Sequence, residues 1–463
     1  MRRRPEADAG TSTKKRLGAV AVLLLAAAAA VPASAGDLPR LPRTQGVPRH
    51  ITYPSDQVLV RFKPRLTPDE LAAIAAGAPG PVRGRAEAIA AFHRRYATRP
   101  GRDVLLGWRR VYLPPGEKVE AVLAEFRTHP AVAAAEPNYR VYGFDLSTTY
   151  TAQAAPDDGF YQDGVSQWWY HRTKADAAYN AGYAFDGGQT VVAVLDTGLD
   201  LDHGEFTGRL VTGRNILVPA LQPEDDHGHG TLVGGAVIAT ADNGLGIAGA
   251  GFAAGLRLMP VKVLDENNSG FVADVAEGIA WAADHGADVL NLSFGVYGVN
   301  PTPLQNACDY AANSRTCFLT ASAGNENTDL DGDPCYPAVY ANVRAVAATD
   351  AQDQRTWYSN YGAAVAIAAP GGCVSPQTGY DVDNGFISTY LVGGYAVTEG
   401  TSFAAPQVAA LAGMLKHQSP SRSWAQVWNV IVNHAENPRG ESADLVGAGR
   451  INLHGALSVY QTP

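Results

Sequence analysis

Short apolar runs recur along the second half of the chain, and each ends in small or polar residues. The runs cover 190–198 (TVVAVLDTG), 256–265 (LRLMPVKVLD), 287–295 (ADVLNLSFG) and 317–325 (CFLTASAGN). Short, apolar segments of this kind are typical of strands buried on both faces. Helical patterns lie between them, as in 272–286 (VADVAEGIAWAADHG). The alternation predicts an α/β fold, with a mostly parallel sheet covered by helices on both faces.

The pattern before residue 145 is different and predicts a small α+β domain. Residues 58–64 (VLVRFKP) alternate as a strand does, and 131–142 (AVAAAEPNYRVY) predict one closing strand. Between them, 67–76 (TPDELAAIAA) and 119–130 (VEAVLAEFRTHP) predict two helices, the first opened by Thr67. The turn-rich stretch 145–163 contains no core element, which predicts a flexible boundary there.

The first 35 residues have the pattern of a signal peptide. Basic residues precede an apolar run from Leu17 to Val31, and Ala33 and Ala35 supply small residues for cleavage. The run is short for a membrane span, which favours export over the alternative of a retained N-terminal anchor. No cysteine follows the cleavage site to carry a lipid, and residues 36–51 form a Pro- and Arg-rich spacer. We therefore expect a secreted, extracellular protein without a membrane segment after signal removal.

Charge is divided unevenly along the chain. Residues 1–144 carry 23 Lys and Arg against 12 Asp and Glu, whereas residues 145–463 carry 13 against 33. The two segments are predicted to attract one another. An acidic main body argues against nucleic acid as a partner. All four cysteines lie in the acidic segment, where export permits disulfides, and their spacing is not that of a zinc site.

Three residue types suited to nucleophilic catalysis lie at element boundaries. Asp196 ends an apolar run, His229 opens a predicted helix in 224–235 (EDDHGHGTLVGG), and Ser402 opens another in 400–417 (GTSFAAPQVAALAGMLKH). A serine hydroxyl needs a base to take its proton, and the base needs a carboxylate to fix its tautomer. In parallel sheets, active residues gather at the carboxyl ends of strands, where this chain places its polar residues.

The motifs around these residues resemble those of the subtilisin-like serine proteases, the subtilases. VLDTG with Asp196, HGT with His229, ASAGN with Asn325 and GTSFAAP with Ser402 occur in the family's order across residues 160–455. The segment GAGRINLHGAL also resembles the end of the family's domain. The resemblance implies a serine endopeptidase that needs no cofactor for catalysis. Leu232 and Gly234 depart from the family's usual His and Ala, but neither position carries a proton-transfer group.

The resemblance assigns roles to these residues. Asp196, His229 and Ser402 become the catalytic triad, with His229 rather than His227 as the base. Asn325 and the Ser402 N–H become oxyanion donors, because the first turn of a helix leaves N–H groups without internal partners. Pro406 supports a helix start near Ser402. His227 is interpreted as a loop residue, with the alternative that it joins Asp225 or Asp226 in holding a metal or tuning the base.

Substrate-binding segments follow from the same resemblance. Peptide is expected to add as a strand that uses backbone groups near Ser293, Phe294 and Gly295 and near Gly270. The pocket for the substrate residue before the cleaved bond is expected to be lined by Ala321, Ser322, Ala323 and Gly324. These walls contain no acidic residue, which favours an apolar or aromatic side chain, while Glu326 at the rim would admit some basic ones.

The resemblance also extends to domain organisation and structural sites. Residues 52–144 resemble the inhibitory propeptide of subtilases, which predicts a zymogen cleaved within the linker 145–163 and a catalytic domain over 164–463. Residues 240–247 (TADNGLGI) resemble a calcium loop, with Glu205 and Asn243 as the side-chain ligands. The four cysteines allow three pairings, which the sequence alone does not resolve. Cys335 and Cys373 lie near positions that are bridged in some relatives, and Cys308 and Cys317 would then form the other disulfide. Nothing in the sequence indicates oligomerisation, and a monomer is expected.

Two other functions are compatible with parts of the sequence. Residues 244–249 (GLGIAG), with Asp265 about twenty residues on, match a dinucleotide-binding fingerprint. That fingerprint requires a strand before it and a helix after it, and the surrounding glycines predict neither. The other alternative is a catalytically silent secreted binding protein on a protease fold. The presence of all three triad types and Asn325 argues against it.

Overall fold

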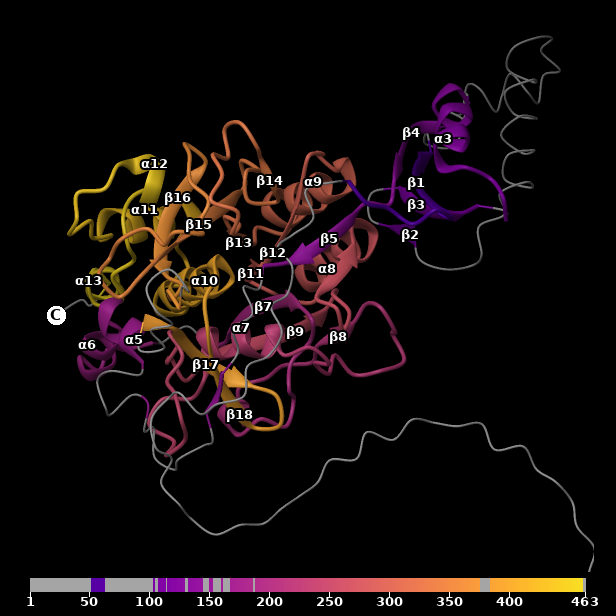
Figure 1. The fold of residues 1–463 in the computed structure, drawn as a ribbon. Coiled ribbons are helices and arrows are strands. Elements are labelled where there is room, and N and C mark those ends of the chain that lie inside the picture. Colours follow the sequence, from indigo (N-terminus) through magenta and orange to yellow (C-terminus); the bar gives the residue numbers. More distant parts are fainter. Residues whose placement is uncertain are drawn as a thin grey trace, which may run out of the picture. The chain divides into compact units, whose positions relative to one another are not determined.

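The centre of the structure, a computed structural model, is a seven-stranded parallel sheet (Figure 1). Its strands lie in the order β16 (Val365–Pro370), β15 (Val343–Thr349), β13 (Phe318–Ser322), β11 (Val289–Leu292), β7 (Thr190–Asp196), β9 (Leu256–Lys262) and β8 (Arg214–Asn215). Every neighbouring pair is parallel. The predicted fold class is confirmed, and β7, β9, β11 and β13 fall within the four apolar runs.

The structure describes only part of the chain. The described residues are 51–62, 103–104, 107–113, 115–129, 132–144, 150–152, 160, 167–185, 188–374 and 384–460. The predicted signal peptide, most of the predicted spacer, most of the predicted linker and the predicted helix 67–76 lie outside them. None of the helices formed by the described residues has the length and apolar character that a membrane crossing requires.

Alternating side chains of β7 enter two different cores, as buried parallel strands require. Val192 and Val194 pack in one core with α7 (His229–Ile238) and α10 (Thr401–Gln418). Val191, Ala193 and Leu195 pack in the other with α8 (Val272–Asp284) and α9 (Thr302–Asp309). Helices therefore cover both faces of the sheet, and α7 lies against α10 on one of them.

The remaining elements flank these layers. The helices are α5 (Trp168–Arg172), α6 (Ala175–Asn180), η2 (Gly204–Phe206), η3 (Tyr310–Ser314), α11 (Trp424–Asn433), α12 (Ala443–Val446) and α13 (Leu453–Ser458). An antiparallel sheet joins β17 (Phe386–Tyr390), β18 (Gly394–Thr398) and β6 (Tyr150–Ala152). Residues 244–249, the candidate dinucleotide motif, lie in an irregular stretch between α7 and β9 and not between a strand and a helix.

The N-terminal segment forms the predicted small α+β structure, with one difference. An antiparallel sheet orders β2 (Asp103–Val104), β3 (Trp108–Tyr112), β1 (Gln57–Phe62) and β4 (Val132–Pro137), and α3 (Val119–Thr128) packs on it. The single closing strand predicted over 131–142 is wrong, because the chain forms β4 and then a separate strand, β5 (Arg140–Gly143). Strand β5 leaves this sheet and pairs with two strands of the acidic segment.

Candidate active site

The carboxyl end of β7 and the first residue of α7 bring Asp196 and His229 together. Asp196 Oδ1 accepts a hydrogen bond of 2.7 Å from His229 Nδ1, and both side chains are fully buried. The backbone N–H of Thr197 donates to the same oxygen, also at 2.7 Å. With Nδ1 as the donor, the proton of a neutral His229 ring lies on Nδ1, which leaves Nε2 as the basic nitrogen.

Ser402 lies in the first turn of α10, beside α7. The ring of the next residue, Phe403, has its centroid 5.8 Å from that of His229. The Ser402 hydroxyl donates to the Phe144 carbonyl at 2.6 Å and lies 3.3 Å from the Ser293 carbonyl oxygen. The structure thus brings the three predicted triad residues into one region, with Asp196 bonded to His229 and Ser402 engaged by the end of β5.

Pro406 lies inside α10 and has a local consequence at Ser402. Proline has no N–H, so the Ser402 carbonyl four residues earlier loses its helical donor. The Ser293 hydroxyl donates to that carbonyl instead, at 2.9 Å. This bond links the start of α10 to the segment between β11 and β12 (Phe294–Tyr297), next to which the substrate was predicted to bind.

Asn325 is positioned by the residue that precedes Ser402. Its Oδ1 accepts from both the backbone N–H and the hydroxyl of Thr401, at 2.9 and 2.7 Å. These two bonds determine which end of the amide faces Thr401, so Nδ2 faces the other way. Nδ2 lies 3.5 Å from the Phe144 carbonyl oxygen, the oxygen that the Ser402 hydroxyl also contacts.

Strand β5 occupies the predicted substrate position between β10 and β12, in an antiparallel sheet of four strands. Tyr142 and Gly143 pair with Gly295 and Phe294 of β12, while Arg140 to Tyr142 pair with β10 (Ser269–Phe271). The Phe144 N–H then donates to the Ser293 carbonyl. The predicted strand residues Ser293, Phe294, Gly295 and Gly270 therefore all face a bound segment of this same chain.

The Phe144 side chain is buried in a pocket that includes Ala323, one of the four predicted wall residues. It is 1 % exposed and packs with Tyr297, Ala323, Leu330 and Cys335, its ring centroid lying 6.2 Å from that of Tyr297. A Cβ atom on Gly295 would approach within 2.4 Å of the Phe144 ring, so only glycine leaves room for it. Tyr297 and Cys335 were not predicted, because apolar residues outside the motifs give no signal of their position.

The other predicted wall residues differ in their position relative to the pocket. Gly324 adjoins the pocket, since a Cβ atom there would meet the Tyr297 hydroxyl. Ala321 and Ser322 are buried in β13, and Ala321 packs in the core with α8. The Glu326 carboxylate, predicted at the rim, accepts from the Tyr297 hydroxyl and from the Asn325 N–H. The Glu326 carboxylate therefore already accepts hydrogen bonds from groups of the protein itself.

The predicted calcium ligands, Glu205 and Asn243, do not fit a calcium ion. Glu205 is fully buried and accepts from the Ile247 N–H, the Tyr395 hydroxyl and the Asn243 amide, at 3.0, 2.8 and 2.9 Å. Asn243 Oδ1 accepts from the Leu245 N–H at 2.9 Å. Calcium requires six to eight oxygens directed at it, whereas hydrogen-bond donors are directed at this carboxylate. No cluster of three potential metal-ligating side chains occurs among the described residues.

Calcium is therefore expected to leave the stability of this loop unchanged. If calcium bound here, a free calcium concentration of a hundred times its Kd would raise the free energy of unfolding by about 2.7 kcal/mol, which corresponds to several degrees in Tm. We expect the thermal midpoint of the protein to be the same in excess calcium and in EDTA. A calcium-dependent rise that Asn243→Ala removes would contradict this, whereas a rise that persists in the variant would come from another site.

The predicted disulfides are not formed. None of the four cysteines, all of which lie among the described residues, is in a disulfide. Cys308 lies in α9 within the α8 core, and the Cys317 thiol donates to the Ala287 carbonyl at 3.1 Å. Cys335 contributes to the pocket around Phe144, and burial raises the pKa of its thiol well above the usual value. Cys335 therefore forms part of the wall of the pocket around Phe144.

Comparison with known proteins agrees with this geometry. Residues 187–449 match the model of the Subtilase family. The chain is 35% identical to a thermophilic serine proteinase of Bacillus sp. (strain AK1) over 340 residues, which are 73% of this chain and 76% of that protein. It is 36% identical to thermitase of Thermoactinomyces vulgaris over 272 residues, 59% of this chain and 90% of that protein.

The fold also matches solved structures. The crystal structure of an epidermin leader peptide processing serine protease from Staphylococcus aureus has a TM-score of 0.69 and 18% identity. The match covers 89% of this chain and 99% of that one. At that identity the likeness concerns the fold alone, and the family assignment rests on the sequence matches. The chain belongs to the subtilase family and is a serine-type endopeptidase.

Proposed function

We propose that this protein is an exported endopeptidase made as a zymogen, in which Asp196, His229 and Ser402 form the catalytic triad. His229 Nε2 takes the proton of the Ser402 hydroxyl as its oxygen attacks the peptide carbonyl, and then gives that proton to the leaving amine. Asp196 holds the Nδ1 proton and stabilises the imidazolium. Asn325 Nδ2 and the Ser402 N–H stabilise the oxyanion.

The observation that carries the proposal is the contact of two groups with one carbonyl oxygen. The Ser402 hydroxyl and Asn325 Nδ2 both face the oxygen of Phe144, at 2.6 and 3.5 Å, at the end of a strand held as a peptide substrate would be. A nucleophile and an oxyanion donor must meet at the carbonyl of the cleaved bond. The bond that follows this carbonyl, Phe144–Asp145, is therefore the proposed maturation site.

The same segment supports an inhibitory role for residues 52–144. While β5 lies between β10 and β12, it occupies the groove that another peptide would need. Contacts away from the groove also hold residues 52–144 against the acidic segment. Arg110 of the basic segment pairs with Asp274 of the acidic segment at 2.6 Å. The Asn138 side chain accepts a hydrogen bond from the Ala273 N–H of α8. These contacts support the docking that the uneven charge predicted.

The pocket supports a preference for aromatic residues before the cleaved bond. The Phe144 ring is enclosed by apolar groups, and the Glu326 carboxylate accepts hydrogen bonds from Tyr297 and Asn325. A basic side chain would enter without an available partner, which costs free energy. Glu326 is therefore not expected to admit basic side chains, contrary to what its position in the sequence suggested.

Labelling by phosphonate esters tests both the nucleophile and the preference. A diphenyl phosphonate with a phenylalanine side chain should modify Ser402 at least about tenfold faster than the lysine analogue, since side-chain differences in such pockets are worth about 10- to 200-fold. Mass spectrometry of the labelled peptide gives the site, with Ser402→Ala as the blank. Labelling of another residue, or equal rates with the two reagents, would contradict the assignment.

A further inference from the structure

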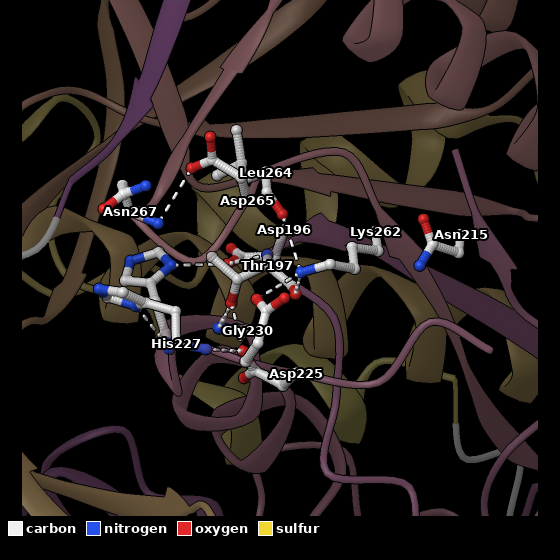
Figure 2. Close-up of polar contacts among 12 residues, drawn as sticks. Asp196, Thr197, Asn215, Asp225, His227, Gly230, Lys262, Leu264, Asp265 and Asn267 are labelled. Carbon is white, nitrogen blue, oxygen red and sulfur yellow. Dashed lines mark hydrogen bonds and ion pairs between the residues drawn. The ribbon is translucent and has the colours of Figure 1, made fainter. Parts of the chain in front are cut away.

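Thr197, the residue after Asp196, connects the end of β7 to the start of α7. Its backbone N–H donates to Asp196 Oδ1, and its hydroxyl accepts from the Gly230 N–H at 2.9 Å. The same hydroxyl donates to Asp225 Oδ1 at 2.8 Å. Figure 2 shows Thr197 lying between Asp196, Asp225 and Gly230. One buried side chain therefore contacts both segments that carry Asp196 and His229.

The Asp225 carboxylate accepts hydrogen bonds from several donors at the start of α7. Oδ1 accepts from the His227 and Gly228 N–H groups as well as from Thr197, and Oδ2 accepts from the N–H and hydroxyl of Thr231 at 2.9 and 2.6 Å. Burial raises the pKa of this carboxyl, but the hydrogen bonds outweigh burial and the pKa lies below its usual value. A charged carboxylate thus satisfies N–H groups that the helix itself leaves unpaired.

The strand end is held from its other side as well. Lys262 of β9, which is 5 % exposed, donates to the Thr197 carbonyl, to the Leu264 carbonyl at 3.0 Å and to Asp226 at 2.6 Å. Figure 2 shows this side chain reaching Thr197 from the side away from His227. Every polar group of Thr197 is thereby engaged, and the residue has little freedom to rotate.

This arrangement bears on catalysis because Thr197 and His229 share one oxygen. Asp196 Oδ1 accepts from both, each at 2.7 Å. A change in the orientation of Thr197 would move that oxygen relative to the His229 ring. Close packing transmits such a change, since a Cβ atom on Gly230 would lie 2.1 Å from the Gly198 carbonyl oxygen.

We propose that Thr197 and Asp225 are positioning residues, which fix the Asp196 carboxylate against His229 by clamping the end of β7 to the first turn of α7. Neither touches the substrate, so they act through the triad. The inference rests on the proposed function, because it gives Thr197 and Asp225 a purpose only if Asp196 and His229 are catalytic. Loss of the clamp should lower kcat and leave KM unchanged, since β10, β12 and the pocket remain intact.

The test uses Thr197→Val, which keeps the shape of the side chain and removes its hydroxyl. With enzyme matured from the full chain, we expect kcat to fall about 10- to 100-fold, the loss typical of a small misplacement of catalytic groups. Thr197→Ser restores the hydroxyl and should stay within about threefold of wild type. Thr173→Val is the matched control, because it removes another fully buried hydroxyl, bonded to the Trp169 and Tyr170 carbonyls far along the chain from the triad.

The outcomes separate positioning from general destabilisation. Unchanged kcat in Thr197→Val, a kcat loss that Thr197→Ser does not rescue, or an equal loss in Thr173→Val would each overturn the proposal. If Thr197→Val is not recovered folded, Thr197→Ala takes its place under the same criteria. Ser402→Ala is assayed in parallel: activity that survives there refutes the proposed function itself, whereas an inactive Ser402→Ala beside an unaffected Thr197→Val refutes only the positioning role.

Discussion

Ser402→Ala is expected to lower turnover about a millionfold and to leave the precursor uncut at Phe144–Asp145. The magnitude is that of subtilisin, a relative in the same family, in which removal of the serine costs about 2 × 10⁶ in kcat. The Ser402 hydroxyl donates to the Phe144 carbonyl at 2.6 Å, and alanine removes this hydroxyl while keeping a small side chain at the buried helix start. The measurements are kcat on a peptide substrate and the N-terminal sequence of the mature enzyme, which should begin at Asp145.

A control substitution at another buried serine distinguishes a loss of catalysis from a general effect of removing a buried hydroxyl. Ser359 is also fully buried and donates to the Asn360 carbonyl at 3.1 Å, so Ser359→Ala removes an equivalent hydroxyl elsewhere. It should mature normally and keep kcat within about threefold. A Ser402→Ala protein that still hydrolyses peptides, or a mature wild-type N-terminus elsewhere in 145–163, would refute the serine assignment or the maturation site respectively.

Asp196→Asn should lower kcat about 10⁴-fold at neutral pH, with KM nearly unchanged. The size is that of the corresponding change in other Ser-His-Asp enzymes. Asparagine is neutral, so it stabilises the imidazolium less. Its N–H₂ can also donate to Nδ1, which places the ring proton on Nε2, where the serine proton must be accepted. The readouts are kcat and KM across pH, together with the rate of phosphonate labelling.

The control for this variant is an aspartate that lies just before β11 and is hydrogen-bonded to β7. Asp288 Oδ2 accepts from the Val191 N–H at 2.9 Å, near the opposite end of β7 from Asp196. Asp288→Asn makes the same chemical change and should retain kcat within about threefold. If both variants lose activity equally, the effect of Asp196 would be structural, and its catalytic role would be rejected.

The sequence predicted the scaffold well because buried strands and helices have strong patterns. Fully buried β7 is continuous in apolar residues up to Asp196, and α7 and α10 begin within one residue of the expected positions. The resemblance of the motifs to those of subtilases also implied which residues converge. That information is local, however, and it cannot describe contacts between segments that share no motif.

The errors and omissions have physical causes. Residues 131–142 formed two strands, because pairing with β10 and β12 competes for the second half of that segment. Glu205 failed as a calcium ligand because its carboxylate meets donors from three distant positions, Asn243, Ile247 and Tyr395. The network around Asp225 was missed as a positioning device, although the consecutive acidic residues of EDDHGHGT were a signal that a helix start needed an anion nearby.

Because β5 lies between β10 and β12 of the same chain, the proposed maturation cut would be a reaction within one molecule. Its rate should not depend on protein concentration, because the tether keeps the segment at a high effective concentration whatever the volume. Once the bond is broken, the released fragment must find the groove again by diffusion, and its hold weakens as the solution is diluted. Spreading into a large volume would therefore suffice to turn on an exported enzyme of this design.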